Sequence, residues 1–134
     1  MLGEYRVVPS LPAADLERAA RFYGEKLGLS EISHNDAAVE FRSGSTKFGV
    51  YKTDYAGTAQ HTLAAWEVDD IEEAVDQLRS RGVVFEEYDF PGVKTVGGIA
   101  DLGSERGAWF KDSEGNILAL AQSKPASARK QRAR

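Results

Sequence analysis

Apolar residues recur with the spacing of an α-helix in two separate parts of the chain. Positions three and four apart lie on one face of a helix, so each recurrence predicts an amphipathic helix packed on a sheet. The two apolar stripes are Leu16, Ala19, Ala20, Tyr23 and Leu27, and Ile71, Ala74, Val75 and Leu78.

Both predicted helices have matching start and stop signals. Asp15 and Asp70 precede the two stripes, and an acidic side chain at that position accepts hydrogen bonds from the first free backbone N–H groups. Gly28 and Gly82 follow the stripes, where a glycine in the left-handed conformation ends a helix. Residues 14–20 therefore align with 69–75 as an internal repeat.

Short runs of strand-forming residues follow each helix, and an apolar strand-like run precedes it. Turn-forming residues separate the runs at 43–46, 97–98 and 112–116, while residues 89–98 are the stretch least well defined by pattern. The predicted strands after the helices are 29–33, 38–42, 47–52, 83–88, 99–102, 108–111 and 116–121. Each half of the chain therefore has the order strand, helix, strands.

Composition limits the class of protein. The 134 residues suit one domain of ordinary size, and they include no cysteine, which excludes disulfides, thiolate metal sites and cysteine nucleophiles. The N-terminus has no apolar targeting segment and no stretch is long enough to span a bilayer, so we expect a soluble, cytoplasmic protein.

Charge is unevenly placed along the chain. The net charge of −4 argues against nucleic acid as a partner, because phosphate binding requires clustered cations. Residues 124–134 carry five cations and no anion, without apolar periodicity. We expect this segment to be a disordered basic tail after a single domain at 1–123.

Several motifs together resemble one known family, the vicinal-oxygen-chelate superfamily of glyoxalase I, extradiol dioxygenases, fosfomycin-resistance enzymes and bleomycin-binding proteins. The motifs that carry the resemblance lie at 11–19, 22–23, 27–29, 68–71 and 109–116. The resemblance implies an α+β fold of two tandem βαβββ modules, at about 4–53 and 60–123, that form a curled mixed-sheet cup with helices outside. It also implies a homodimer with a ligand or metal in the cup.

Metal-dependent members of this family carry His, Gln or Glu at four positions of the cup. The number of residues between these positions and the flanking motifs of the family identifies the equivalent residues of this sequence. Three of them are Val8, Leu63 and Ala119, and the fourth is near Gly49 or Tyr51. Divalent cations need oxygen or imidazole donors, so we expect no metal and no other cofactor. A slip of two residues in the count would bring His61 into the site.

Strand alternation and the resemblance together suggest which side chains line the cup. In the strand before the second helix, the residues expected to face the cup are His61, Leu63, Ala65 and Glu67. In the last strand, Leu118 and Leu120 are expected to pack under the helix, and Ile117, Ala119 and Ala121 to face the cup. The complete predicted cup lining is Val8, Tyr51, Tyr55, His61, Leu63, Glu67, Asp101, Arg106, Trp109 and Ala119.

Three functions fit this reading. The first is a bleomycin-resistance-like protein that binds a small molecule in an apolar cup without metal. The second is a lyase or dioxygenase-type enzyme that uses an atypical metal site or metal-free acid–base catalysis. The third is a structural or regulatory dimer with no ligand, whose cup would be filled by its own side chains. Asp112 and Glu114 lie in a turn, where hydrogen bonding to the backbone explains them better than catalysis.

Overall fold

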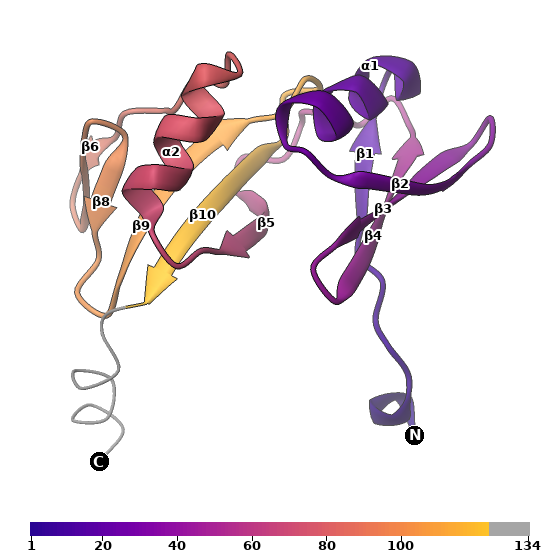
Figure 1. Cartoon of the computed structure of the whole chain (residues 1–134), viewed down its shortest axis with the longest axis horizontal. Coiled ribbons are helices and arrows are strands. Elements are labelled where there is room, and N and C mark those ends of the chain that lie inside the picture. The colour runs from indigo at the N-terminus through magenta and orange to yellow at the C-terminus, as the bar shows by residue number, and fades with distance from the viewer. Residues whose placement is uncertain (124–134) are drawn as a thin grey trace. The chain divides into compact units, whose positions relative to one another are not determined.

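A computed structural model describes residues 1–123, so the predicted basic tail lies outside the described residues. The chain divides into two compact units, and each is described separately. Unit 1 comprises residues 1–60 with the turn 112–116, and unit 2 comprises residues 61–111 with the strand that follows the turn (Figure 1). No helix within residues 1–123 is long and apolar enough to cross a membrane.

Unit 1 is a four-stranded sheet with one helix across it (Figure 1). The strand order is β1-β4-β3-β2, with β1 parallel to β4 and the other pairs antiparallel. Its elements are a 3-10 turn at Leu2–Glu4, β1 at Ser10–Ala13, α1 at Leu16–Arg21, a π-helical turn at Phe22–Lys26, β2 at Ser30–His34, β3 at Ala38–Ser43 and β4 at Thr46–Lys52.

The π-helical turn explains how α1 covers the sheet. Asp15 caps the helix by accepting a hydrogen bond from the Arg18 amide at 3.0 Å, as predicted. One extra residue in the next turn lets the neighbouring Phe22 and Tyr23 both be buried. Tyr23 then packs against Phe41 and Phe48, each with ring centroids 5.6 Å away. This aromatic cluster is the core of unit 1.

Unit 2 is a six-stranded sheet covered by one helix, which lies over β9 and β10 (Figure 1). The strand order is β5-β10-β9-β8-β7-β6, with β5 parallel to β10. Its elements are β5 at Thr62–Glu67, α2 at Ile71–Ser80, β6 at Asp89–Phe90, β7 at Val93–Val96, β8 at Ile99–Asp101, β9 at Glu105–Lys111 and β10 at Ile117–Ser123. The Asp70 side chain caps α2 by accepting from the Glu73 amide at 3.1 Å.

The predicted strand at 83–88 is wrong. That stretch makes a single bridge, Phe85 to Phe110, and the regular hairpin lies later, where β6 pairs with β7. The physical reason is the pair Pro91 and Gly92 between the two strands. Proline restricts the first turn position and Gly92 adopts a φ of 89°, which favours a tight turn at this point.

The predicted α+β fold is confirmed. Each unit begins with a strand and a helix and continues into antiparallel strands, and in each unit the first strand lies parallel to the last one. Both sheets are open, and each has one face under its helix.

Candidate functional site

In unit 2, strand alternation separates a face beneath α2 from an open face. Leu118, Leu120 and Phe110 are buried on the helix side, next to Ile71 and Val75 of α2. The expectation that Leu118 and Leu120 pack under the helix is therefore confirmed. Residues at the alternate positions of the same strands face the other way.

The centre of this open face is a floor of very small residues. Ala119 pairs with Trp109 of β9 and with Ala65 of β5, while Ala121 pairs with Gly107 and with Glu67. Pairs that lie directly opposite each other in a sheet project to the same side. The centre of the open face is therefore apolar, with Ala119 and Gly107 buried and Ala65 and Ala121 accessible, and the Trp109 indole and the Glu67 carboxylate lie on the same face.

Three aromatic rings form a row on the same face. The Trp109 and Tyr88 centroids are 5.5 Å apart, and those of Tyr88 and Phe90 are 5.7 Å apart. The indole lies over Gly107, because a Cβ built on that glycine would be 3.1 Å from the outer ring carbon Cη2. Phe90 is 52% exposed, so the row is accessible to solvent at that end.

Two polar residues expected in the cup lie on the opposite face of this sheet. Arg106 alternates along β9 with the residues of the open face and so projects to the same side as Ala108 and Phe110. Its guanidinium binds Glu72 of α2 at 2.8 Å. Asp101 is the strand partner of Arg106, and its carboxylate accepts the Gly103 amide at 2.9 Å. Both side chains therefore contribute to the helix side, which corrects the expected lining.

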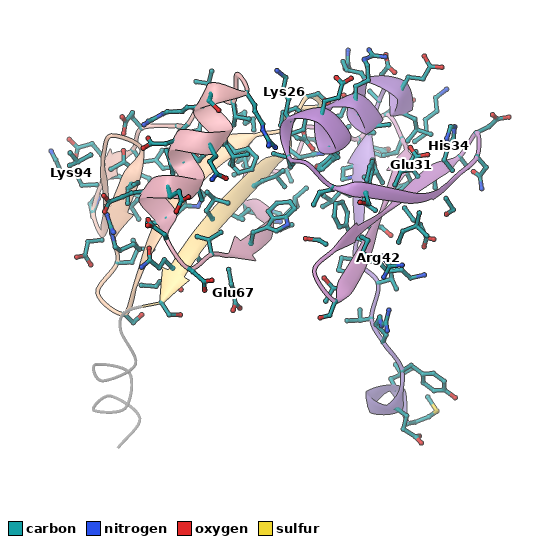
Figure 2. All side chains as sticks on the ribbon, viewed as in Figure 1. Lys26, Glu31, His34, Arg42, Glu67 and Lys94 are labelled. Carbon is teal, nitrogen blue, oxygen red and sulfur yellow. The ribbon has the colours of Figure 1, made fainter. Side chains whose placement is uncertain are left out.

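The open face of unit 1 is polar. Glu40 of β3 accepts a hydrogen bond from the Ser33 hydroxyl at 3.0 Å and lies 3.5 Å from the Lys47 ammonium. Arg42, which is labelled in Figure 2, is the strand partner of Lys47 and lies on the same face. Sequence reasoning missed these charges, although the alternation of polar residues along 38–42 could have identified them.

Four further residues of the predicted lining lie at the end of a strand or outside the strands. Val8 precedes β1 by two residues and Tyr51 is 44% exposed on β4. Tyr55 lies in the following turn, and His61 is an exposed residue just before β5. None of these four residues lies on the floor of small residues. Of the predicted lining residues, Ala119 is the one that belongs to this floor.

The residues at the family's metal positions do not fit a metal ion. Leu63 and Ala119 place hydrocarbon on β5 and β10, Val8 does so before β1, and Gly49 adds no side chain. A phenol at Tyr51 would be the single oxygen donor in the set. Within residues 1–123, no three His, Cys, Asp or Glu side chains group in a way that would hold a cation.

A shallow hollow lies on the other side of unit 1, beside α1. Leu16, Glu17 and His34 line two adjoining parts of it, an apolar part of about 250 Å³ and a polar part of about 460 Å³. His34 is paired with Glu31 at 3.4 Å near the end of β2, and Figure 2 shows the two side chains close together. The histidine therefore has a local partner in an exposed setting.

The turn 112–116 holds the start of α1. Glu114 Oε1 accepts hydrogen bonds from the Ala14 and Asp15 amides, both at 2.9 Å, and Arg18 Nε donates to Oε2 at 2.8 Å. N–H groups at a helix start have no partner within the helix, and a negative charge there is favourable. Burial alone would raise the pKa of Glu114, but the hydrogen bonds from Arg18, the Asp15 amide and Ser113 outweigh it and lower that pKa to about 2.

Asp112 forms the second half of this buried cluster. Its Oδ1 accepts the Glu114 and Asn116 amides, both at 2.9 Å, which is the predicted turn chemistry. Its Oδ2 also accepts the Tyr23 hydroxyl at 2.5 Å, a link that sequence reasoning missed. Burial and the nearby Asp112 charge raise the pKa of Tyr23. Because every carboxylate in the cluster is paired, the arrangement is structural.

Comparison with solved structures places this fold among proteins of varied activity. An antibiotic binding protein from Streptomyces, TnmS3, is 20% identical with a TM-score of 0.62, over 90% of this chain and 98% of that one. A lactoylglutathione lyase from Agrobacterium tumefaciens is 16% identical with a TM-score of 0.64, over 87% and 92% of the two chains. The fosfomycin resistance protein FosX from Listeria monocytogenes, in complex with Mn(II), is 16% identical with a TM-score of 0.68, over 97% and 98%.

These identities show a shared fold and leave the activity open, and no curated protein sequence matches the chain significantly. The family model for the Glyoxalase/Bleomycin resistance protein/Dioxygenase superfamily matches residues 6–120. The match covers most of the sequence and includes both helices and the turn that caps α1. This chain therefore belongs to the Glyoxalase/Bleomycin resistance protein/Dioxygenase superfamily.

Proposed function

We propose that this protein binds a small molecule on the open face of unit 2 without the help of a metal ion. The observation that carries the proposal is the floor of Ala65, Ala119 and Ala121, which occupies a face where catalytic relatives would need donor side chains. Ala119 is itself one of the transferred metal positions. Its methyl group offers contact area to a ligand and no electron pair to a cation.

The character of this face supports ligand binding over a purely structural role. A structural dimer would need large side chains to fill the open face, whereas Ala65 and Ala121 leave space above β5 and β10. Ala119 is buried and Gly107 lies under the Trp109 indole, so the accessible part of the floor is at Ala65 and Ala121. A fold neighbour named as an antibiotic binding protein supports the same class of function. The predicted homodimer also remains a proposal, which sedimentation equilibrium of the full chain will test.

Two measurements test the metal-free part of the proposal. Elemental analysis of protein purified without chelator should find less than about a tenth of an equivalent of any transition metal. Addition of Mn²⁺, Zn²⁺ or Ni²⁺ should give no saturable rise in melting temperature. A stoichiometric metal would instead support the enzyme alternative with an atypical site.

Ligand binding is tested with a panel of aromatic, cationic and antibiotic compounds. A ligand that binds the folded state raises the melting temperature in proportion to the logarithm of its concentration above Kd. We expect at least one saturable rise that is lost in Ala65→Glu, because Ala65 is exposed and the longer side chain would occupy the space above the floor. The matched control is Ala56→Glu in unit 1, outside the floor, where binding should persist. If no compound in a broad panel produces a shift, the proposal fails.

A further inference from the structure

Charge is segregated along the open face of unit 2. Along β9, the residues on this face run from Glu105 through Gly107 and Trp109 to Lys111. On β5, Glu67 lies beside Ala121, and Ala121 lies beside Gly107. The two carboxylates Glu67 and Glu105 therefore occupy one end of the face, and the aromatic row begins nearer to the other.

The carboxylates at the acidic end have no partner within the described chain. Neither Glu67 nor Glu105 makes a side-chain hydrogen bond or ion pair with another residue of 1–123. Arg106, between them in the sheet, is directed to the opposite face, where it binds Glu72. Figure 2 shows the Glu67 side chain extending away from α2. The acidic end is thus available to an external cation.

On the open face of β5, β10 and β9, within the described residues, one further charged side chain is present, and it already has a partner. Lys111 lies beyond Trp109 at the far end of β9, 3.8 Å from Glu86. Neighbouring strands are about 4.8 Å apart, so the span from β9 across β10 to β5 is about 10 Å. That span matches a ligand with a ring system of two or three fused rings and one charged group.

The nature of the ligand follows from these three features. An accessible apolar floor with an indole beside it favours a planar ring, since aromatic groups stack with offset or edge-on geometry. An indole or phenol ring also attracts a cation over its face. Free carboxylates at the end of the floor add complementary charge, in a chain whose net charge is −4.

We infer that the open face of unit 2 selects flat aromatic cations over neutral or anionic molecules of the same shape. The inference rests on the proposed small-molecule function and names its ligand class. The ring would lie on Ala65 and Ala121 beside the Trp109 indole, which covers Gly107, and the positive group would lie toward Glu67 and Glu105. The carboxylates provide the preference for a cation, and the floor and the aromatic rings provide the affinity that charged and neutral aromatic ligands have in common.

A matched set of probes tests the inference on the full chain. The probes are 1-methylquinolinium, the neutral quinoline at pH 8, naphthalene-2-sulfonate and tetramethylammonium, each titrated by calorimetry and by tryptophan fluorescence. We expect the quinolinium to bind about tenfold more tightly than quinoline, as a cation between π faces and carboxylates should. The sulfonate and the non-aromatic cation should bind at least tenfold more weakly than the quinolinium.

Variants assign the preference to its residues. In Glu67→Gln with Glu105→Gln, the tenfold preference for the cation should fall to about twofold or less, while quinoline affinity stays unchanged. Trp109→Leu should weaken both aromatic probes about tenfold. Asp76→Asn, which removes one exposed carboxylate from α2, should leave every affinity within about twofold and so controls for net charge.

The outcomes separate the two proposals. If quinoline and the sulfonate bind as tightly as the cation, or the double variant keeps the cation preference, the ligand class is overturned while the small-molecule function stands. If no probe binds, the ligand class is overturned, and if the broader panel also gives no shift, the proposed function fails as well. Binding of the cation that survives Trp109→Leu would place it elsewhere and overturn the inference.

Discussion

Arg18 and Glu114 form a two-point ion pair across 96 positions of the sequence. Arg18 Nε lies 2.8 Å from Glu114 Oε2, and Arg18 Nη2 lies 3.0 Å from Glu114 Oε1. The carboxylate side chain is fully buried, and it also caps the amides at the start of α1. A turn from late in the chain is therefore required to complete the first helix.

The ionised form of Glu114 should make the protein acid-sensitive. Its pKa is lowered to about 2 in the folded state, so its contribution to stability is fully present above the unfolded pKa of about 4.5. That contribution is lost as the pH falls from about 4.5 to about 2, and the shift corresponds to roughly 3 kcal/mol. Urea unfolding between pH 6 and pH 2.5 measures it. Glu114→Gln should be less stable at pH 6 and show a flatter dependence on pH, and an unchanged slope would contradict the assignment.

The hydroxyl of Tyr23 should contribute measurably to stability. Tyr23→Phe removes the donor to Asp112 while keeping the packed ring, so a buried carboxylate loses one of its hydrogen bonds. The expected loss in unfolding free energy is about 1–3 kcal/mol. Tyr51→Phe is the matched control, since its ring is 44% exposed, and it should change stability by less than about 0.5 kcal/mol. Equal effects of the two variants in urea unfolding would show that the Tyr23 hydroxyl is dispensable.

Gly57 should tolerate no side chain, because the buried turn passes directly over it. A Cβ at this position would lie 2.5 Å from the Glu114 carbonyl oxygen, and the backbone φ is +76°. Gly57→Ala should therefore cost more than about 2 kcal/mol, from the clash and from backbone strain together. Gly44→Ala separates the two causes, since Gly44 has a φ of +58° but open space around it. Its expected cost is about 1 kcal/mol, from the left-handed backbone alone, and similar melting temperatures for both variants would exclude the clash.

Features that depend on neighbouring residues were predictable from the sequence. The caps at Asp15 and Asp70 and the positive φ of Gly28 and Gly82 each follow from chemistry within one turn of the chain. The role of Glu114 could not be predicted from the sequence, because its partners are about a hundred positions away and no local pattern identifies them. The prediction that Glu114 belongs to a hydrogen-bonded turn was therefore correct, but it did not include the contacts of Glu114 with the start of α1.

In the candidate site, too, local features were predictable from the sequence and long-range contacts were not. Trp109 and Arg106 are three positions apart, and that spacing alone puts them on opposite faces of a regular strand. Strict use of alternation would have removed Arg106 from the expected lining. The proximity of Tyr88 to Trp109 could not be derived in this way, because the chain before β6 makes one bridge only and has no regular periodicity.

The position of the Trp109 indole should depend on the absence of a side chain at Gly107. A Cβ there would lie 3.1 Å from the indole Cη2 and 3.4 Å from Leu102 Cδ1, so Gly107→Ala forces the ring away from its place on the open face. Overpacking of this kind costs about 1–3 kcal/mol, because the neighbours must shift. We expect altered tryptophan emission, a lower melting temperature, and 1-methylquinolinium affinity weakened about fivefold or more. Gly49→Ala is the control, since its new Cβ would meet Ser10 Oγ at an ordinary 3.7 Å, and its emission should match the unsubstituted protein. Unchanged emission and affinity in Gly107→Ala would mean that the indole has room to move without loss, and the glycine would then not determine the shape of the site.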